Sequence, residues 1–321
     1  MPAAKPSRVL IVLAFAAIYV IWGSTYLGIR LAIETLPPFL MAATRFILAG
    51  AILFAWAVFK GQKIRPALAQ WPTAFILGGL MLLCGNGGVT WAEKYIASGL
   101  AALLVATEPL WIVILNWGIT HTRPNWKVLL GVLTGLAGVS LLVSDGLGQG
   151  VHGLRISLIG AGVVVFASFA WAAGSVYSSR RPIRAMTSMA SGMQMLAGGG
   201  LLLLLALIAG DFKRLNLDNA SWVSIGALSY LTLFGSLVSF TAYSWLLNHV
   251  STARAATYAY VNPAVAVFLG WLIASEPLTP KMFLAAAIIV GSVVLITTFG
   301  HDHSATAPAL HDSDCPTHPC A

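Results

Sequence analysis

Apolar residues fill ten stretches of this chain, each bounded by charged or turn-forming residues. The stretches cover residues 9–29, 38–59, 72–92, 98–119, 126–143, 155–177, 187–209, 221–246, 253–274 and 280–299. Most of them reach the roughly 20 residues that an α-helix needs to cross the hydrocarbon core of a bilayer. The pattern therefore predicts an all-α integral membrane protein with ten transmembrane helices.

The predicted helices form two copies of one unit. The motif Gly-Ser-x-Tyr at residues 23–26 returns 151 positions later at 174–177, and Glu108-Pro109 returns 154 positions later as Asn262-Pro263. Each copy holds five predicted spans. Because five is odd, the two copies must cross the membrane in opposite directions. Such inverted repeats are typical of secondary transporters, which bind substrate near the bilayer midplane between the copies.

The repeat and the charge pattern together predict the topology. With the N-terminus inside, eleven of the 18 Lys and Arg residues fall on the cytoplasmic side and six fall outside, in keeping with the positive-inside rule. We therefore expect a multi-pass protein of the bacterial inner (cytoplasmic) membrane with both termini in the cytoplasm. The expected segments are a cytoplasmic N-terminus (1–8), a first repeat (9–143), an outer connecting loop (144–154), a second repeat (155–299) and a cytoplasmic tail (300–321).

Composition narrows the class of protein. Hydrophobic residues make up 58% of the chain and charged residues 9%, whereas a soluble domain carries roughly 25% charged residues, so a soluble protein is excluded. The net charge of +8 fits a basic inner face against anionic membrane lipid and needs no nucleic acid. No His-Glu-x-x-His, Gly-x-Ser-x-Gly or Walker motif is present, which argues against an enzyme and against ATP-driven transport. We expect no cofactor.

The tail differs in composition from the rest of the chain. Residues 300–321 contain four of the seven His residues, together with Cys315 and Cys320. These residues lack the fixed spacing of a zinc site. A disordered tail without a metal is expected, and metal binding there is the open alternative.

Two ionisable residues lie well inside predicted spans, Arg45 and Glu108. A charge at the centre of a membrane helix costs on the order of 3 kcal/mol, so each is a candidate for function. Glu108 precedes Pro109, and its counterpart Asn262 precedes Pro263. Each proline removes a backbone donor and is expected to kink its helix at mid-membrane depth, where the two polar residues would meet near the pseudo-two-fold axis. The alternatives are that both residues only recover hydrogen bonds lost at the prolines, and that Arg45 ties a helix end to headgroups or carbonyls.

Hydroxyl and aromatic residues complete the candidate substrate site. Hydroxyl groups offer hydrogen bonds and aromatic rings offer a wall for a polar organic solute, although helix packing and an interfacial aromatic belt explain the same residues. Asn86 and Glu93 are weaker candidates for a cavity or gate. Small residues in the fifth and tenth spans allow close helix packing, so a monomer or a homodimer is expected. The remaining candidates are Trp22, Ser24, Tyr26, Trp111, Ser175, Tyr177 and Tyr258.

These motifs resemble a known transporter family. The chain is similar to the EamA family of the drug/metabolite transporter superfamily over roughly residues 9–299, and in particular to bacterial inner-membrane exporters of unassigned substrate. The resemblance implies ten helices in two inverted five-helix repeats, a central cavity, and export of small metabolites or toxic analogues by secondary transport. It identifies no solute. The motifs that carry it are Trp22-Gly23-Ser24-Thr25-Tyr26, Pro37-Pro38 with Arg45-Phe46, Gly85-Asn86, and Tyr258-Ala259-Tyr260-Val261-Asn262-Pro263 with Gly270 and Glu276.

The hypothesis from sequence is a secondary active transporter that works by alternating access and exports amino acids, related small metabolites or drugs. Glu108 would bind an amino group or a proton, Asn262 would hydrogen-bond the substrate, and Arg45 would pair with Glu108 or with an anionic group. Proton coupling is left open. The alternatives are an uncoupled facilitator or channel, and a membrane scaffold or sensor that transports nothing. Substrate, coupling ion, direction and oligomeric state do not follow from the residues.

Overall fold

The computed structural model of the protein describes residues 7–63, 69–121, 123, 125–144, 150–250, 255, 257–276 and 278–299. Most of the predicted N-terminal segment, residues 145–149 of the connecting loop, and the tail with Cys315 and Cys320 lie outside this part of the chain, so the expectations about them stay predictions. Residues 150–154, expected in the loop, belong to the helix that begins at Gly150. The described residues form helices and turns and include no strand.

The first half of the chain builds five helical runs. The first three contain α1 (Arg8–Ala16), η1 (Ala17–Ile21) and α2 (Trp22–Ala32); α3 (Pro38–Phe59); and α5 (Trp71–Leu77), η2 (Gly78–Asn86) and α6 (Gly87–Ala92). The fourth and fifth contain α7 (Ser98–Val105) with α8 (Glu108–Thr120), and α9 (Trp126–Ser144).

The second half repeats this order. Its first two runs are α10 (Gly150–Arg180) and α11 (Thr187–Ile208), which the short α12 (Asp211–Arg214) and η4 (Leu217–Asn219) follow. The remaining runs contain α13 (Trp222–Tyr230), η5 (Leu231–Phe240) and α14 (Thr241–Leu247); α16 (Tyr258–Ala274); and α17 (Pro280–Phe299).

The predicted all-α membrane fold is confirmed. Seven helical runs among the described residues are long and apolar enough to cross a membrane: Arg8–Ala32, Pro38–Phe59, Trp71–Ala92, Ser98–Thr120, Leu158–Arg180, Thr187–Ile208 and Trp222–Leu247. Shorter apolar helices, at Trp126–Gly138, Val261–Ala274 and Pro280–Ser292, lie within the other three predicted spans. That these three shorter helices also cross the membrane, which would give ten crossings, stays a prediction.

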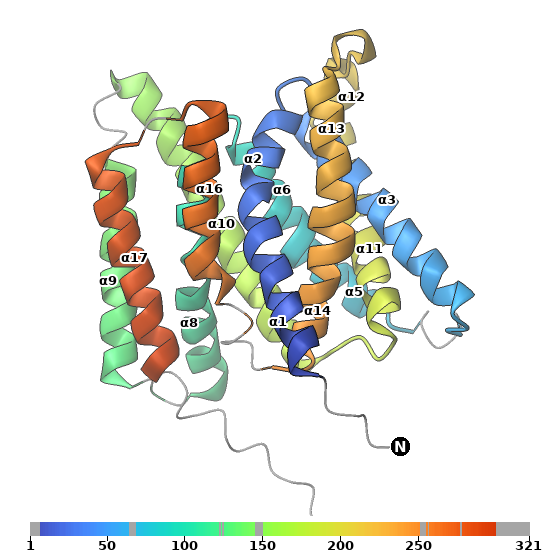
Figure 1. Ribbon diagram of the computed structural model, residues 1–321, viewed down its shortest axis with the longest axis horizontal. Coiled ribbons are helices and arrows are strands. Elements are labelled where there is room, and N and C mark those ends of the chain that lie inside the picture. The colour runs from blue at the N-terminus through green and yellow to red at the C-terminus, as the bar shows by residue number, and fades with distance from the viewer. Residues whose placement is uncertain are drawn as a thin grey trace, which may run out of the picture.

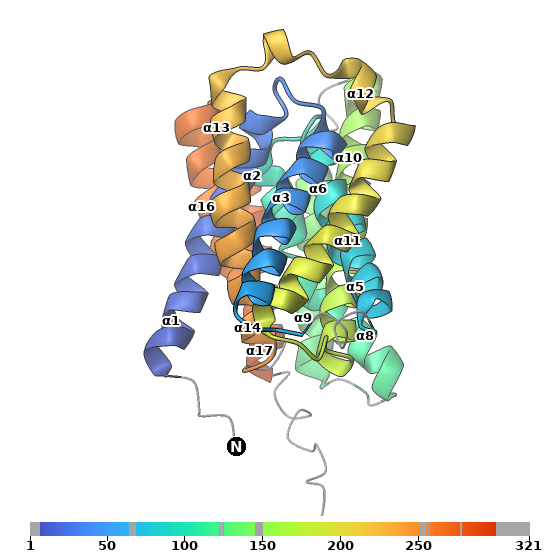
Figure 2. The same ribbon diagram turned by 90° about the vertical axis from the view of Figure 1, so that its right-hand side faces the viewer.

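Equivalent helices of the two repeats run in opposite directions. The carboxylate of Asp211, which follows α11, accepts hydrogen bonds from the backbone N–H groups of Phe39 (2.9 Å) and Leu40 (3.1 Å) at the start of α3. At the other end of the same pair, Gln62 follows α3 and its side-chain oxygen accepts from the N–H of Met186 (3.2 Å), just before α11. The helices α3 and α11 are therefore antiparallel neighbours (Figure 2), as inverted repeats require.

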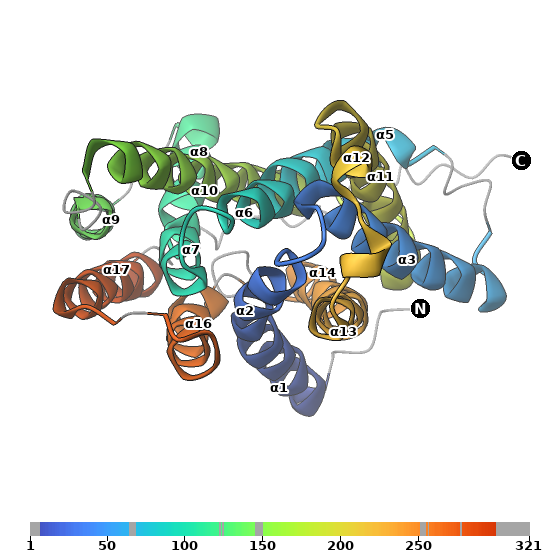
Figure 3. The ribbon, with the colours of Figure 1, turned by 90° about the horizontal axis from the view of Figure 1, so that it is seen from above.

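The first helix of each repeat packs against the other repeat. Helix α2 contacts α13 and α16 of the second half, and α10 contacts α6, α7 and α8 of the first half. Seen from above (Figure 3), α2 lies between α16 and α13. The last helices, α9 and α17, pack together at one edge (Figure 1). Because each packs against the opposite repeat, α2 and α10 lie at the centre of the bundle.

Several spans interrupt their α-helical hydrogen bonding near the middle. Segments η2 and η5 are π-helical and occupy equivalent positions in the third and eighth spans. The fourth span breaks into two helices at Ala106 and Thr107, and Pro109 lies in the first turn of the second helix, where a missing N–H breaks no helical bond. Pro263 lies inside α16. The two polar-proline motifs therefore differ in backbone structure. Glu108-Pro109 begins a helix, whereas Asn262-Pro263 lies inside one, where the proline removes a backbone hydrogen bond.

We call the two ends of the bundle the α12 end and the α1 end. The α12 end, at the top of Figure 1, carries the short helix α12, and the α1 end carries the start of α1. Spans one, three, seven and nine finish at the α12 end, where Arg30, Glu93, Asp211 and Glu276 lie in or just after their last turns. This end therefore gathers four charged side chains that are buried or partly buried.

Candidate functional site

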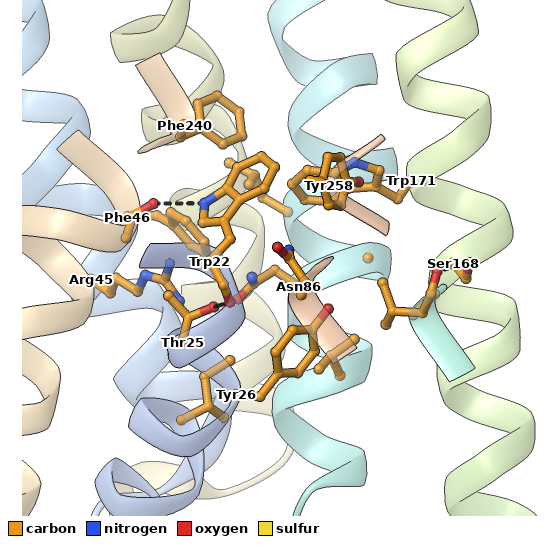
Figure 4. A pocket seen from close by; sticks show the side chains of 18 residues that line it. Trp22, Thr25, Tyr26, Arg45, Phe46, Asn86, Ser168, Trp171, Phe240 and Tyr258 are labelled. Atoms are coloured by element: carbon orange, nitrogen blue, oxygen red, sulfur yellow. Dashed lines mark hydrogen bonds between the residues drawn. The ribbon is translucent and has the colours of Figure 1, made fainter. Parts of the chain in front are cut away.

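A cavity lies at the centre of the bundle between the two repeats (Figure 4). Its volume of about 70 Å³ is space for the centres of roughly five water molecules, which together fill about 150 Å³ of liquid. The lining residues are Trp22, Thr25, Tyr26, Ile29, Arg45, Phe46, Leu82, Gly85, Asn86, Val89, Val105, Ala167, Ser168, Trp171, Gly235, Phe240, Tyr258 and Asn262.

An aromatic cluster forms one wall of the cavity. The ring of Trp22 lies 5.6 Å from that of Trp171, 5.2 Å from that of Tyr258 and 5.0 Å from that of Tyr243, measured between centroids. The indole nitrogen of Trp22 donates to the carbonyl of Gly235 at 3.1 Å, which fixes the ring. Aromatic faces at this spacing offer a rigid, mainly apolar surface that also attracts cations.

Arg45 brings a buried positive charge to the lining of the cavity. Its side chain is 3% exposed, its Nε donates to Ser236 Oγ at 2.7 Å, and its guanidinium lies 4.8 Å from the centre of the Phe46 ring. A Cβ atom at Gly235 would lie 2.8 Å from Arg45 Nη2, so glycine leaves the space that the guanidinium fills. Nη1 has no hydrogen-bond partner among the described residues.

The expected ion pair between Arg45 and Glu108 is absent from the described residues. Glu108 is fully buried at the start of α8, and its Oε2 accepts a hydrogen bond from the hydroxyl of Tyr258. Its other oxygen has no partner in the described chain. Because Glu108 is not among the lining residues, it meets the cavity through Tyr258. Arg45 therefore lacks the hydrogen-bonded counter-ion that a buried charged group normally has.

Asn262 serves the backbone of the first span. With its amide oriented as the neighbouring groups require, the side-chain nitrogen lies 3.0 Å from the carbonyl oxygen of Tyr19 and 3.2 Å from those of Ile18 and Tyr258. The π-helical turn η1 leaves these carbonyls of the first span available. Asn262 also lines the cavity, so only its amide oxygen is left for a ligand.

Four further candidates lie outside the cavity lining. Ser24 donates to the carbonyl of Ile21 at 2.7 Å and its hydroxyl lies 2.6 Å from that of Tyr230. Ser175 is buried one contact behind the aromatic cluster, 2.9 Å from the Tyr243 hydroxyl. Trp111 packs on Phe169, and Tyr177 is partly buried against the core cluster that includes Trp22 and Tyr243. The equivalent residues Tyr26 and Tyr177 therefore have different surroundings.

The structure adds lining residues that no sequence signal singles out. Ser168 accepts a hydrogen bond from Thr107 at 3.1 Å and donates to the carbonyl of Val105 at 3.2 Å. It therefore provides hydrogen-bond partners for polar groups at the break in the fourth span. Phe240 ends η5 and packs on Trp171 at 6.3 Å between centroids. Both positions depend on the packing of α10 and η5 against other spans, which the apolar pattern does not encode.

A second group of charges lies at the α12 end, just beyond the cavity. Arg30 Nη1 donates to the backbone carbonyl of Glu93 at 2.7 Å, which ties the end of α2 to the end of α6. The Glu93 side chain is fully buried, and neither carboxyl oxygen has a hydrogen-bond partner in the described part of the chain. Glu276 instead accepts from the N–H groups of Ser98 (2.8 Å) and Gly99 (3.1 Å) at the start of α7.

Comparison with known proteins identifies the family. The model of the EamA-like transporter family matches residues 9–144 and 158–298. This chain belongs to the EamA-like transporter family. The resemblance inferred from the motifs is thereby confirmed, and the EamA-like fold and the apolar helices make the protein a multi-pass membrane transporter.

Bacterial relatives agree with this assignment. The chain is 40% identical over 287 residues to YedA of Escherichia coli strain K12, an uncharacterized inner membrane transporter, covering 88% of this chain and 89% of YedA. It is 22% identical over 287 residues to the uncharacterized transporter YoaV of Bacillus subtilis strain 168, covering 89% and 96% of the two chains. The EamA-like helices also match a crystal structure with a TM-score of 0.64 at 22% identity, covering 91% and 99% of the two chains, which supports the fold alone.

Proposed function

We propose that this protein is a secondary active transporter that exports small metabolites bearing a carboxylate, of which amino acids are the main class. The observation that carries the proposal is the buried guanidinium of Arg45, which lines an aromatic cavity and has an unused donor at Nη1. Guanidinium groups bind carboxylates through short, charge-assisted hydrogen bonds. A substrate carboxylate would therefore supply the counter-charge that the protein does not.

The rest of the cavity suits the remainder of an amino acid. The aromatic wall around Trp22 and Trp171 would contact an apolar or aromatic side chain, and the ring faces would attract an ammonium group. Glu108 would contribute negative charge through its hydrogen bond with Tyr258, and the amide oxygen of Asn262 would accept a hydrogen bond. The volume of about 70 Å³ favours these small solutes over large drugs.

The inverted repeat supports alternating access as the mechanism. Because the two halves are inverted copies packed around one central cavity, exchanging their conformations would open the cavity to the opposite side of the membrane. We place the α12 end outside and the α1 end, with both termini, in the cytoplasm, on the basis of the positive-inside rule. Export, active coupling and the use of ten crossings belong to this proposal.

The direct test measures ligand binding to purified protein with three related probes. L-phenylalanine carries a carboxylate and an ammonium, phenylacetate lacks the ammonium, and phenethylamine lacks the carboxylate. A ligand that binds only the folded state raises the unfolding temperature. We expect stabilisation by L-phenylalanine and phenylacetate and none by phenethylamine, with the effect lost in Arg45→Gln and kept in the exposed control Arg181→Gln.

Two results would contradict the proposal. Stabilisation by phenethylamine alone would assign the site to cations, and equal stabilisation of Arg45→Gln and the unmodified protein would remove Arg45 from the site. Flux into proteoliposomes then separates the transport modes. Accumulation against a gradient that an uncoupler collapses supports active transport, whereas equilibration alone supports an uncoupled facilitator.

A further inference from the structure

The buried carboxyl group of Glu93 has no use in the proposed substrate site. Glu93 follows α6, and its backbone N–H bonds the carbonyl of Val89, a lining residue, at 3.0 Å. The side chain is fully buried without a hydrogen-bond partner among the described residues. A buried carboxylate in this position would lose its hydration and gain nothing, so the neutral, protonated form is favoured.

The side chains that interact electrostatically with Glu93 come from three parts of the fold. Arg30 and Tyr26 belong to α2, Arg45 belongs to α3, and Glu276 follows α16; each interacts electrostatically with the Glu93 carboxyl. Arg30 already donates to the backbone carbonyl of Glu93. Arg45 lies on α3, which packs against α6, and its Nη1 is buried without a hydrogen-bond partner in the described chain.

The two neighbouring carboxyl groups differ in their support. The oxygens of Glu276 accept two N–H groups from the start of α7, where the helix dipole and the unpaired amides stabilise a negative charge. Glu93 has no such donors. Burial raises the pKa of the Glu93 carboxyl well above its usual range, and the adjacent charge of Glu276 raises it further. The arginines Arg30 and Arg45 lower the same pKa by smaller amounts.

We propose that Glu93 is a proton-binding site linked to the substrate site through Arg45. When Glu93 is protonated and neutral, Arg45 keeps its charge for the carboxylate of a substrate. When Glu93 loses its proton, its carboxylate becomes the counter-ion of Arg45 and competes with the substrate. This inference rests on the proposed function in one respect, the binding of an anionic group by Arg45.

The sign of the linkage follows from this competition. A proton on Glu93 strengthens substrate binding, and by reciprocity a bound carboxylate raises the proton affinity of Glu93. Substrate affinity is therefore highest at low pH and falls as the pH rises through the range in which ligand-free Glu93 titrates.

The test compares L-phenylalanine binding to purified protein between pH 5.5 and 8.5. One linked proton changes affinity by up to about tenfold per pH unit, and we expect a fall approaching this slope for the unmodified protein. Glu93→Gln, which keeps a neutral side chain of the same size, should bind with the low-pH affinity at every pH. Glu34→Gln is the matched control, since Glu34 is exposed at the same end of the bundle and its loss should leave the slope unchanged.

Infrared spectroscopy provides a measurement that needs no ligand. The unmodified protein should show protonated carboxyl absorption at neutral pH, which should decrease in Glu93→Gln, where buried Glu108 can still contribute, and stay unchanged in Glu34→Gln. If the band is unaffected by Glu93→Gln, or if Glu93→Gln keeps the original pH slope, the proton site is wrong. If the infrared band behaves as expected but Arg45→Gln binds L-phenylalanine normally, the proposed substrate site fails instead.

Discussion

Replacing Asp211 by alanine tests whether a carboxylate from one repeat holds a helix start of the other. Asp211 is 1% exposed and accepts hydrogen bonds from the amides of Phe39 and Leu40. Each hydrogen bond to a charged group contributes about 1.5–3 kcal/mol, and water would recover part of that energy at the partly buried helix end. We therefore expect Asp211→Ala to cost about 2–4 kcal/mol of local stability, and Asp211→Asn, which keeps an acceptor, to cost about 1 kcal/mol.

Hydrogen exchange in detergent measures this effect at the amides themselves. Since 1.36 kcal/mol corresponds to a factor of ten, the amides of Phe39 and Leu40 should exchange roughly 30- to 900-fold faster in Asp211→Ala. The control is Asp218→Ala, because Asp218 is exposed in the same connection and its removal should change neither amide. Unchanged exchange at Phe39 and Leu40 in Asp211→Ala would refute the reasoning, whatever happens to global stability.

Two further substitutions test the packing and the buried acid. A Cβ at Gly192 would lie 2.8 Å from the backbone nitrogen of Phe54 in α3, so Gly192→Val should lower the unfolding free energy by about 1–3 kcal/mol through overpacking. The control is Gly200→Val in the same helix, where the added side chain meets open space and should leave the thermal midpoint unchanged. Tyr258→Phe removes the hydrogen bond to Glu108 and should lower the free energy of unfolding by about 1–3 kcal/mol, because the carboxyl loses its partner. Equal melting temperatures of Tyr258→Phe and the control Tyr95→Phe would count against that bond.

The apolar pattern predicted seven helical runs that are long enough to cross a membrane, but not the contacts between them. Spans and inverted repeats depend on length, spacing and parity, which the sequence states directly. The faces of the helices do not follow in the same way, because lipid chains are as apolar as the protein core and a buried face needs no distinct composition. The bond between Arg45 and Ser236, 191 residues apart, depends on the rotation of α3 against η5 and could not be predicted from either segment.

The fourth span shows a second reason for the difference. The motif Glu108-Pro109 predicts a kinked helix, yet the chain breaks at Thr107 and restarts, with Pro109 in the first turn of α8. Proline is compatible with the first turn of a helix as well as with a kink, so the residue alone does not decide. Packing decides here, because the hydroxyl of Thr107 bonds the carbonyl of Leu104 at 2.7 Å and lies 3.1 Å from Ser168 Oγ of α10.

Differences between equivalent positions explain why the two ends of the bundle have different chemistry. At the α12 end the start of α3 meets the carboxylate of Asp211, whereas at the α1 end the start of α11 meets the neutral amide of Gln62. Arg30 is partly buried against Glu93, while its counterpart Arg181 is exposed. Inverted copies with identical side chains would respond alike on both sides of the membrane. Because buried acids gather at the α12 end, a change in proton concentration would act mainly on that side of the carrier, which gives an otherwise symmetric scaffold a direction.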